Sequence, residues 1–208
     1  MLALTFDDGP DPRGTPAVLA ALAAADVSAT FFVLGAMVER NPALLAEVID
    51  AGHGVEVHGY EHLRHRESSH AAVEADLNRA LAALADAGVQ PTRWRIPWGQ
   101  LADFTAGLAS AHELELVGWT SDTHDWRGDS AEDMLGALEL HQGGVVLAHD
   151  GIGPGARRTS ARQTAELIGP LVQRARRHDL RPGPLVPGWP VTVPAGNPER
   201  GHGVGERV

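Results

Sequence analysis

Short β-branched or aromatic segments alternate with longer Ala- and Leu-rich segments along most of this 208-residue chain. The short segments have the composition and length of buried strands. They cover residues 2–6, 27–34, 54–58, 92–97, 114–120 and 143–149. Strands that alternate with helical segments are typical of a parallel sheet. We therefore predict an α/β fold built on a parallel sheet, either open or closed into a barrel.

The segments between these strands predict helices whose ends carry residues that favour starts and stops. Pro16 lies early in the first helix, Asn41 and Gly52 are the expected N-cap and stop of the second, and Gly88 ends the third. The predicted helices cover residues 15–25, 42–51, 69–87, 101–111, 130–140 and 160–177. After Arg181 the composition shifts to Pro, Gly and Val, with room for one last strand at residues 184–187.

Composition limits the chemistry that the chain can perform. A hydrophobic content of 43% suits one globular domain, and a net charge of −10 argues against nucleic acid or an anionic membrane as partner. There is no cysteine, and all 17 basic residues are arginine, which excludes thiolate nucleophiles and Schiff-base lysines. The 11 histidines and the carboxylates must therefore carry any acid–base or metal chemistry.

The start of the chain carries no targeting signal that we recognise. No stretch reaches the ~20 apolar residues of a membrane span, and no basic segment precedes an apolar run near Met1. We expect the chain as given to be cytoplasmic, and secreted only if the true N-terminus lies upstream.

Polar side chains follow nearly every predicted strand. They are Asp7 and Asp8, His58 and His62, Arg95, Asp122 and Asp125, and His149 with Asp150. The carboxyl ends of parallel strands share one face of the sheet, where chemistry collects. An Asp-Asp-Gly-Pro sequence is also common in solvated turns, but five independent placements on one face favour a functional site.

His58 and His62 are four residues apart, which on a helical turn puts both imidazoles on one face. Two histidines and one carboxylate form a common hydrolytic metal site. The alternative is a solvated histidine-rich loop, because His53, His65 and His70 lie nearby in the sequence.

The motifs "TFDDGP", "ATFFVLG", "GHGVEVHGYEH", "RIPWG", "SDTHDW" and "LAHD" follow one another in this order. Together they resemble the polysaccharide deacetylases of the NodB homology type, carbohydrate esterase family 4. The resemblance runs from Leu2 to about Arg181. It implies a distorted (β/α) barrel of about seven parallel strands, with residues 1–183 as the NodB-like catalytic domain and 184–208 as a Pro/Gly-rich tail.

The resemblance also implies a metal-dependent hydrolase that removes an acetyl group from an N-acetylated amino sugar or polysaccharide. By position, Asp8, His58 and His62 would bind one divalent metal ion, and Asp7 would be the catalytic base that takes a proton from water. Arg95 would pair with Asp7 and orient it. Zinc suits two imidazoles and a carboxylate, with cobalt, nickel and iron as chemical alternatives.

On the other side of the site, the resemblance makes His149 the general acid that protonates the departing amine. Asp125 would hold its imidazole, with Asp122 as the fallback. The backbone N–H of Trp98 would be the oxyanion donor, and Trp126 and Leu147 the apolar walls for an acetyl methyl group. For Leu147, packing in the core is an equal alternative.

Two residues depart from the family pattern. Gly59 stands where the family has Ser or Thr, which puts the rigidity of the histidine loop in doubt, and Trp98 replaces a tyrosine. The substrate could thus be a polymer, a small N-acetylated sugar, a non-sugar amide, a formamide or an acetyl ester. A catalytically silent carbohydrate-binding module is a further alternative, and the oligomeric state stays open.

Overall fold

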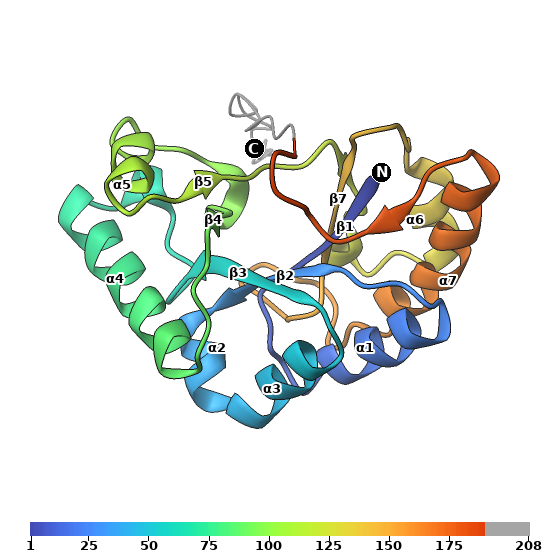
Figure 1. Cartoon of the computed structure of the whole chain (residues 1–208), viewed down its shortest axis with the longest axis horizontal. Coiled ribbons are helices and arrows are strands. Elements are labelled where there is room, and N and C mark those ends of the chain that lie inside the picture. Colours follow the sequence, from blue (N-terminus) through green and yellow to red (C-terminus); the bar gives the residue numbers. More distant parts are fainter. Residues whose placement is uncertain (190–208) are drawn as a thin grey trace, which may run out of the picture.

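The structure is a computed structural model that describes residues 1–189. Seven parallel strands form one sheet in the order β5-β4-β3-β2-β1-β7-β6 (Figure 1). Their bounds are β1 Leu2–Asp7, β2 Thr30–Leu34, β3 Gly54–Gly59, β4 Arg93–Trp94, β5 Glu115–Leu116, β6 Ser121–Asp122 and β7 Val145–His149. Because β5 and β6 are the two edges, the barrel is incomplete. This half-barrel confirms the distorted (β/α) barrel of about seven strands.

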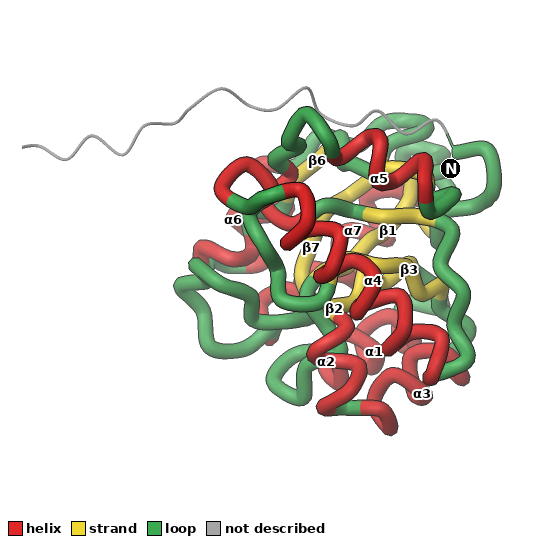
Figure 2. The backbone as a smooth tube through the Cα atoms, turned by 90° about the vertical axis from the view of Figure 1, so that its left-hand side faces the viewer, coloured by secondary structure: helices red, strands yellow, loops and turns green. Residues whose placement is uncertain are grey.

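Helices cover the outside of the sheet, as the two perpendicular views show (Figures 1 and 2). Their bounds are α1 Thr15–Ala24, α2 Gly35–Arg40, α3 Pro42–Asp50, α4 His70–Asp86, α5 Thr105–Ala111, α6 Ala131–Ala137 and α7 Arg162–Arg177. Three 3-10 turns complete the regular structure at His65–Glu67, Pro97–Gly99 and Asp125–Arg127. The α/β layering agrees with the alternation seen in the sequence.

The strand β1 lies inside the sheet, between β2 and β7, and is buried along its whole length. A strand of a parallel sheet that is covered on both faces reads as a continuous apolar run, as "LALTF" does. In register, Asp7 lies beside Phe32 of β2 and beside His149 of β7. The strand therefore places the carboxylate of Asp7 at the end of the sheet where the neighbouring strands also have their carboxyl ends.

The helix α4 shows how the outer layer forms. The side chain of Ser69 accepts a hydrogen bond from the amide of Ala72 at 3.2 Å, which satisfies one free donor at the helix start. Every third or fourth residue then faces the core, with Val73, Leu77 and Leu84 buried. The opposite positions are left for polar side chains.

The structure differs from the sequence-based elements in several places. Of the expected strand at 114–120, only Glu115–Leu116 forms a strand, β5, and the next strand, β6, follows at Ser121–Asp122 on the opposite edge of the sheet. The helix α2 was not predicted. Asn41 occupies the N-cap position of α3, but its side chain does not cap the helix and instead donates to the carbonyls of Pro10 and Met37 at 3.0 and 3.2 Å.

The last strand, β8 Pro182–Gly183, pairs with the start of β1. It precedes residues 184–187, where a strand was expected and none is found. Leu185 and Trp189 are buried against Ala3 and Phe32. The rest of the predicted tail, residues 190–208, lies outside the described residues.

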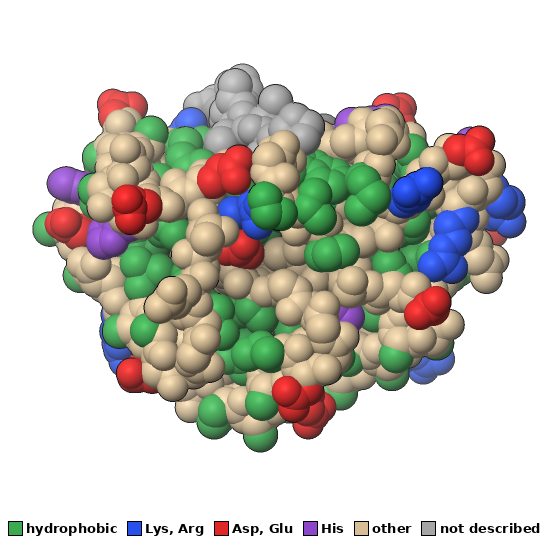
Figure 3. All heavy atoms as spheres, viewed as in Figure 1, with side chains coloured by type: hydrophobic (Ala, Val, Ile, Leu, Met, Phe, Trp, Pro, Cys, Tyr) green, Lys and Arg blue, Asp and Glu red, His purple; other side chains and the backbone are tan. Residues whose placement is uncertain are grey.

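The face shown in Figure 3 carries acidic side chains around its margin and basic ones near α7, whose last turn holds Arg174, Arg176 and Arg177. Within residues 1–189, no helix combines the length and the apolar character needed to cross a membrane.

Candidate active site

The carboxyl ends of the strands surround one pocket of about 260 Å³. The residues that line it belong to β1, β3, β6 and β7 and to the loops that follow the strands. The sequence-predicted residues that line it are Asp7, Asp8, His58, His62, Trp98, Asp122, Trp126, Leu147 and His149. Segments far apart in the chain are thus brought together at the face expected for parallel α/β folds.

Asp7 lies at the end of β1, with an exposed fraction of 2%, and faces a fully buried arginine. Arg95 donates from Nη1 to Oδ1 of Asp7 and to Oγ1 of Thr5, both at 2.8 Å, and from Nη2 to the carbonyl of Gly118 at 3.0 Å. These bonds hold one carboxylate oxygen of Asp7. The other, Oδ2, is 3.8 Å from Nε2 of His58 and belongs to the pocket.

Asp8, His58 and His62 form a group whose ligand atoms all lie within 4.8 Å of one another. Oδ1 of Asp8 is 3.5 Å from Nε2 of His58 and 3.3 Å from Nε2 of His62. This oxygen is buried and has no hydrogen-bond partner among the residues that the structure describes. An oxygen and two imidazole nitrogens that converge in this way fit a divalent cation such as zinc.

The protonation states of this group also suit a cation. Burial lowers the pKa of His58, which keeps its imidazole neutral. Its Nδ1 lies 2.7 Å from the carbonyl of Arg95 and must donate to it, so Nε2 presents its lone pair to the site. Burial alone would raise the pKa of Asp8, but the nearby imidazoles of His62 and His149 hold it well below its usual range.

The two histidines do not lie on a helical turn, so that part of the prediction is wrong. His58 is the penultimate residue of β3, and His62 follows in a loop, with a φ of +58°. Gly59, the last residue of the strand, has a φ of +108°, which glycine adopts readily. Asp8 and Trp98 also have positive φ, +76° and +64°. Such backbone strain gathers at functional sites.

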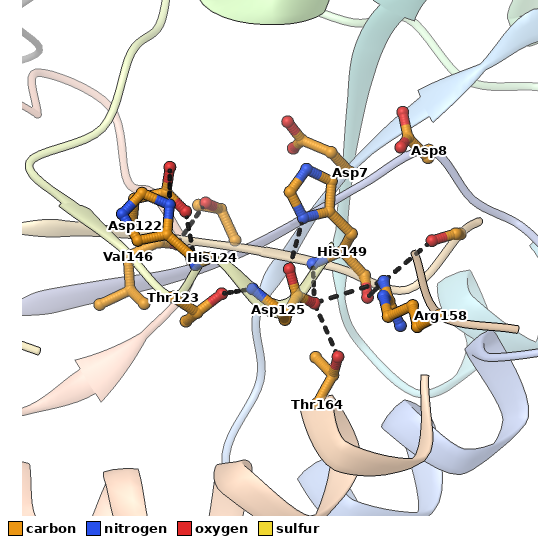
Figure 4. A network of polar contacts seen from close by, with 12 residues as sticks. Asp7, Asp8, Asp122, Thr123, His124, Asp125, Val146, His149, Arg158 and Thr164 are labelled. Carbon is orange, nitrogen blue, oxygen red and sulfur yellow. Dashed lines mark hydrogen bonds and ion pairs between the residues drawn. The ribbon is translucent and has the colours of Figure 1, made fainter. Parts of the chain in front are cut away.

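His149 lies at the end of β7 and contacts Asp125 rather than Asp122 (Figure 4). Its Nδ1 is 2.7 Å from Oδ1 of Asp125, and its backbone amide donates to Oδ2 at 3.0 Å. Burial works against the imidazolium, but the charge of Asp125 and the hydrogen bond to it raise the pKa of His149 to about 10. Conversely, burial opposes ionisation of Asp125, but His149 and Arg158 lower the pKa of this carboxyl to about 2.

Asp122, the fallback partner, contacts His124 and not His149. Its Oδ1 accepts from the backbone amide of His124 at 2.7 Å, and its Oδ2 is 3.1 Å from the His124 ring (Figure 4). The structure therefore resolves the alternative between the two aspartates in favour of Asp125.

Tryptophans form the walls of the pocket. Trp98 donates from Nε1 to the carbonyl of His62 at 3.3 Å, and the guanidinium of Arg64 stacks 3.4 Å from its ring centre. Trp126 lines the same pocket. Leu147 is buried, yet it belongs to neither cluster of packed apolar side chains, which favours a pocket wall over core packing.

Several residues of the site were missed in the sequence. Trp119 lines the pocket, and Arg158 donates to the carbonyls of His149 and Gly151 at 2.8 and 3.0 Å. A Cβ on Gly153 would overlap the carboxylate of Asp8. The only sequence signal was the spacing of glycines in "GIGPGA", which permits close approach of a loop.

Comparisons with known proteins point in one direction. A polysaccharide deacetylase family model matches residues 1–117. A peptidoglycan-N-acetylglucosamine deacetylase of Bacillus cereus is 34% identical over 155 residues, 73% of this chain and 73% of that protein. A chitooligosaccharide deacetylase of a Bradyrhizobium species is 32% identical over 191 residues, 88% of this chain and 87% of that protein.

Solved structures of family 4 carbohydrate esterases have a fold similar to that of this chain. A family 4 carbohydrate esterase from Streptomyces lividans, in complex with acetate, has a TM-score of 0.79 and 29% identity, covering 88% of this chain and 91% of that one. A family 4 pseudoenzyme from Bacillus anthracis shares the fold at a TM-score of 0.79 and 23% identity, covering 89% and 63%, so the fold alone does not establish activity. Because the family model spans more than half of the chain and these relatives align along most of it, the chain belongs to the polysaccharide deacetylase family, carbohydrate esterase family 4.

Proposed function

We propose that the chain is a metal-dependent N-deacetylase that removes acetyl groups from N-acetylated amino sugars, free or within a polysaccharide. The observation that carries the proposal is the arrangement around one pocket of an arginine-held carboxylate, an Asp-His-His group and an aspartate-held histidine. Each of these three parts has a separate task in amide hydrolysis.

Asp8, His58 and His62 would hold the cation, with zinc as the metal that we expect and cobalt, nickel or iron as alternatives. A divalent cation supplies Lewis-acid polarisation of an acyl carbonyl and lowers the pKa of water towards neutrality. Asp8 follows the last residue of β1 with a φ of +76°, and its carboxylate faces the two histidines, whereas the carboxylate of Asp7 is paired with Arg95.

Asp7 accepts the proton of the attacking water. Arg95 holds Oδ1 and leaves Oδ2 directed at the pocket, so the base has one orientation and one available oxygen. A positioned general base contributes about 10²- to 10⁴-fold to the rate.

His149 delivers a proton to the departing nitrogen. It is the register partner of Asp7 on the adjacent strand, so acid and base flank the same space. Asp125 fixes the ring and favours its charged form. Amines leave poorly unless protonated, so this placement suits an amide substrate. The backbone N–H of Trp98 is the proposed oxyanion donor, and Trp126 and Leu147 would contact the acetyl methyl.

The test is acetate release from N-acetylglucosamine, its oligomers and peptidoglycan fragments, with bound metal quantified on the same sample. We expect release from at least one of these substrates, and loss of both metal and activity in His58→Ala. Cleavage restricted to aryl esters or formamides would contradict the substrate class. Saccharide binding without acetate release by the metal-loaded protein would make it a silent binding module.

A further inference from the structure

The loop between the two histidines is held from outside the pocket by one carboxylate. Asp76, on α4, accepts the backbone amide of Tyr60 through Oδ2 at 2.7 Å and that of Glu61 through Oδ1 at 2.9 Å. Both oxygens are thus used on consecutive amides of the segment that links His58 to His62. Hydrogen bonds to an ionised acceptor are about twice as strong as neutral ones.

The two histidines are supported differently. Nδ1 of His58 is fixed by the carbonyl of Arg95 at 2.7 Å. Nδ1 of His62 is buried and has no hydrogen-bond partner within residues 1–189. The ring of His62 therefore lacks the outer partner that normally orients a ligating imidazole. The ring packs against those of Trp98 and His58, with ring centres 5.1 and 5.2 Å apart, and its position otherwise depends on the backbone that carries it.

That backbone adopts a conformation that needs support. Gly59 and His62 both have positive φ, at +108° and +58°. A Cβ on Gly59 would lie 3.0 Å from Oδ2 of Asp76, so the missing side chain leaves the space in which the carboxylate reaches the loop. A side chain at position 59 would therefore crowd the carboxylate of Asp76.

The loop has other contacts besides Asp76. The hydroxyl of Tyr60 donates to Glu39 of α2 at 2.6 Å, and Arg79 of α4 stacks 3.7 Å from the Tyr60 ring. These two contacts hold a side chain. On the main chain, Nε1 of Trp98 donates to the carbonyl of His62 at 3.3 Å, whereas Asp76 holds the two consecutive amides before His62.

We propose that Asp76 is a positioning residue that keeps residues 59–62 in the geometry required for His62 to bind the cation. The inference rests on the proposed function, because it assigns a task to Asp76 only if Asp8, His58 and His62 bind a metal. It also supplies a physical reason why Gly59 can stand in this loop without loss of rigidity: the support comes from the helix.

The experiment compares the full chain with Asp76→Ala, Asp76→Asn and a control, Asp86→Asn. Asp86 is an exposed residue at the end of the same helix, so the control makes the same chemical change away from the loop. Zinc affinity is measured by competition with a chromophoric chelator. Hydrogen exchange at the amides of Tyr60 and Glu61 is followed in the metal-free protein.

We expect Asp76→Ala to weaken zinc binding by about 10- to 100-fold, the usual cost of losing an outer partner of a ligand. Asp76→Asn keeps the size of the side chain but can accept only one of the two amides, so it should lie between this variant and the unaltered protein. Exchange at both amides should accelerate by about tenfold or more in Asp76→Ala, since their hydrogen bonds are lost. Asp86→Asn should change neither measurement.

Zinc affinity in both Asp76 variants within about twofold of the unaltered protein would overturn the inference and leave the proposed function intact. Unchanged exchange at Tyr60 and Glu61 would overturn it as well. Failure of the unaltered protein to bind zinc or any other divalent cation would overturn the proposed function itself, and the inference with it. Asp76→Asn keeps the test decisive if Asp76→Ala does not fold.

Discussion

Asp125→Asn removes the charge that faces His149 while keeping the shape of the side chain. Three donors converge on Oδ2 of Asp125: the amide of His149 at 3.0 Å, the hydroxyl of Thr164 at 2.6 Å and the guanidinium of Arg158 at 3.3 Å. We expect the asparagine oxygen to take this position, because its NH₂ group there would face three donors. The NH₂ group then points to Nδ1 of His149 and opposes its protonation.

The size of the effect follows from the bond that is lost. A hydrogen bond to a charged group is worth about 1.5–3 kcal/mol, and about 1.4 kcal/mol corresponds to one pKa unit. The pKa of His149, raised to about 10 in the structure, should therefore fall by about one to two units. A general acid must be protonated to act, so its loss of a proton forms the base limb of the pH–rate profile. A lower pKa moves that limb to lower pH.

The assay is the pH dependence of kcat/KM on an N-acetylated sugar at saturating metal. A cation at Asp8 offsets the attraction of that carboxylate for the imidazolium of His149. The base limb should therefore lie below pH 10 in the unaltered protein as well as in Asp125→Asn. Asp122→Asn is the matched control, since Asp122 pairs with His124 instead. The reasoning would be refuted if Asp125→Asn left the pH of the base limb unchanged, or if Asp122→Asn shifted it by the same amount.

Other variants test the remaining parts of the site. His149→Ala should slow amide hydrolysis by about 10²- to 10⁴-fold but aryl acetate hydrolysis much less; an equal loss would remove His149 from proton transfer. Asp7→Asn should keep the metal and lose about 10²- to 10⁴-fold in kcat, whereas loss of metal would exchange the roles of the two aspartates. Arg95→Met breaks a buried ion pair and should lower the free energy of unfolding in urea by about 3–5 kcal/mol; a change below about 1 kcal/mol would show that the pair is dispensable. Gly59→Ala should cost about 1–3 kcal/mol in the same assay because of its φ of +108°, and unchanged stability would contradict that strain.

The sequence predicted the long central strands and the side chains at their ends, because a buried parallel strand leaves a continuous apolar run that stops where the polar residues begin. Asp7, His58 and His149 were found in this way, and the structure places them around one pocket. The family resemblance then separated Asp7 from Asp8, which strand pattern alone could not do.

The outer strands were harder to predict. A ladder of two residues, such as β5 or β6, leaves no periodic pattern, so one strand of seven residues was expected at 114–120, and the separate strand β6 at Ser121–Asp122 was not. The four-residue spacing of His58 and His62 suggested a helical turn. The structure has a loop there instead, and no simple sequence pattern predicts a φ of +58° at a histidine. Arg158 and Asp76 reach the site through tertiary contacts alone.

The gap in the half-barrel has a consequence for how this pocket could be remodelled. The strands β5 and β6 lie on opposite edges of the sheet, and the chain joins them through Gly118 and Trp119. On either side of this dipeptide the backbone is hydrogen-bonded to a strand: the amide of Val117 donates to the carbonyl of Trp94, and the amide of Thr120 to the carbonyl of Val145. This dipeptide crosses the opening outside any strand ladder, and Trp119 on it forms part of the pocket wall. Substitutions at Trp119 can therefore reshape this wall of the pocket without breaking a strand pairing, which makes this crossing a suitable place to engineer substrate preference.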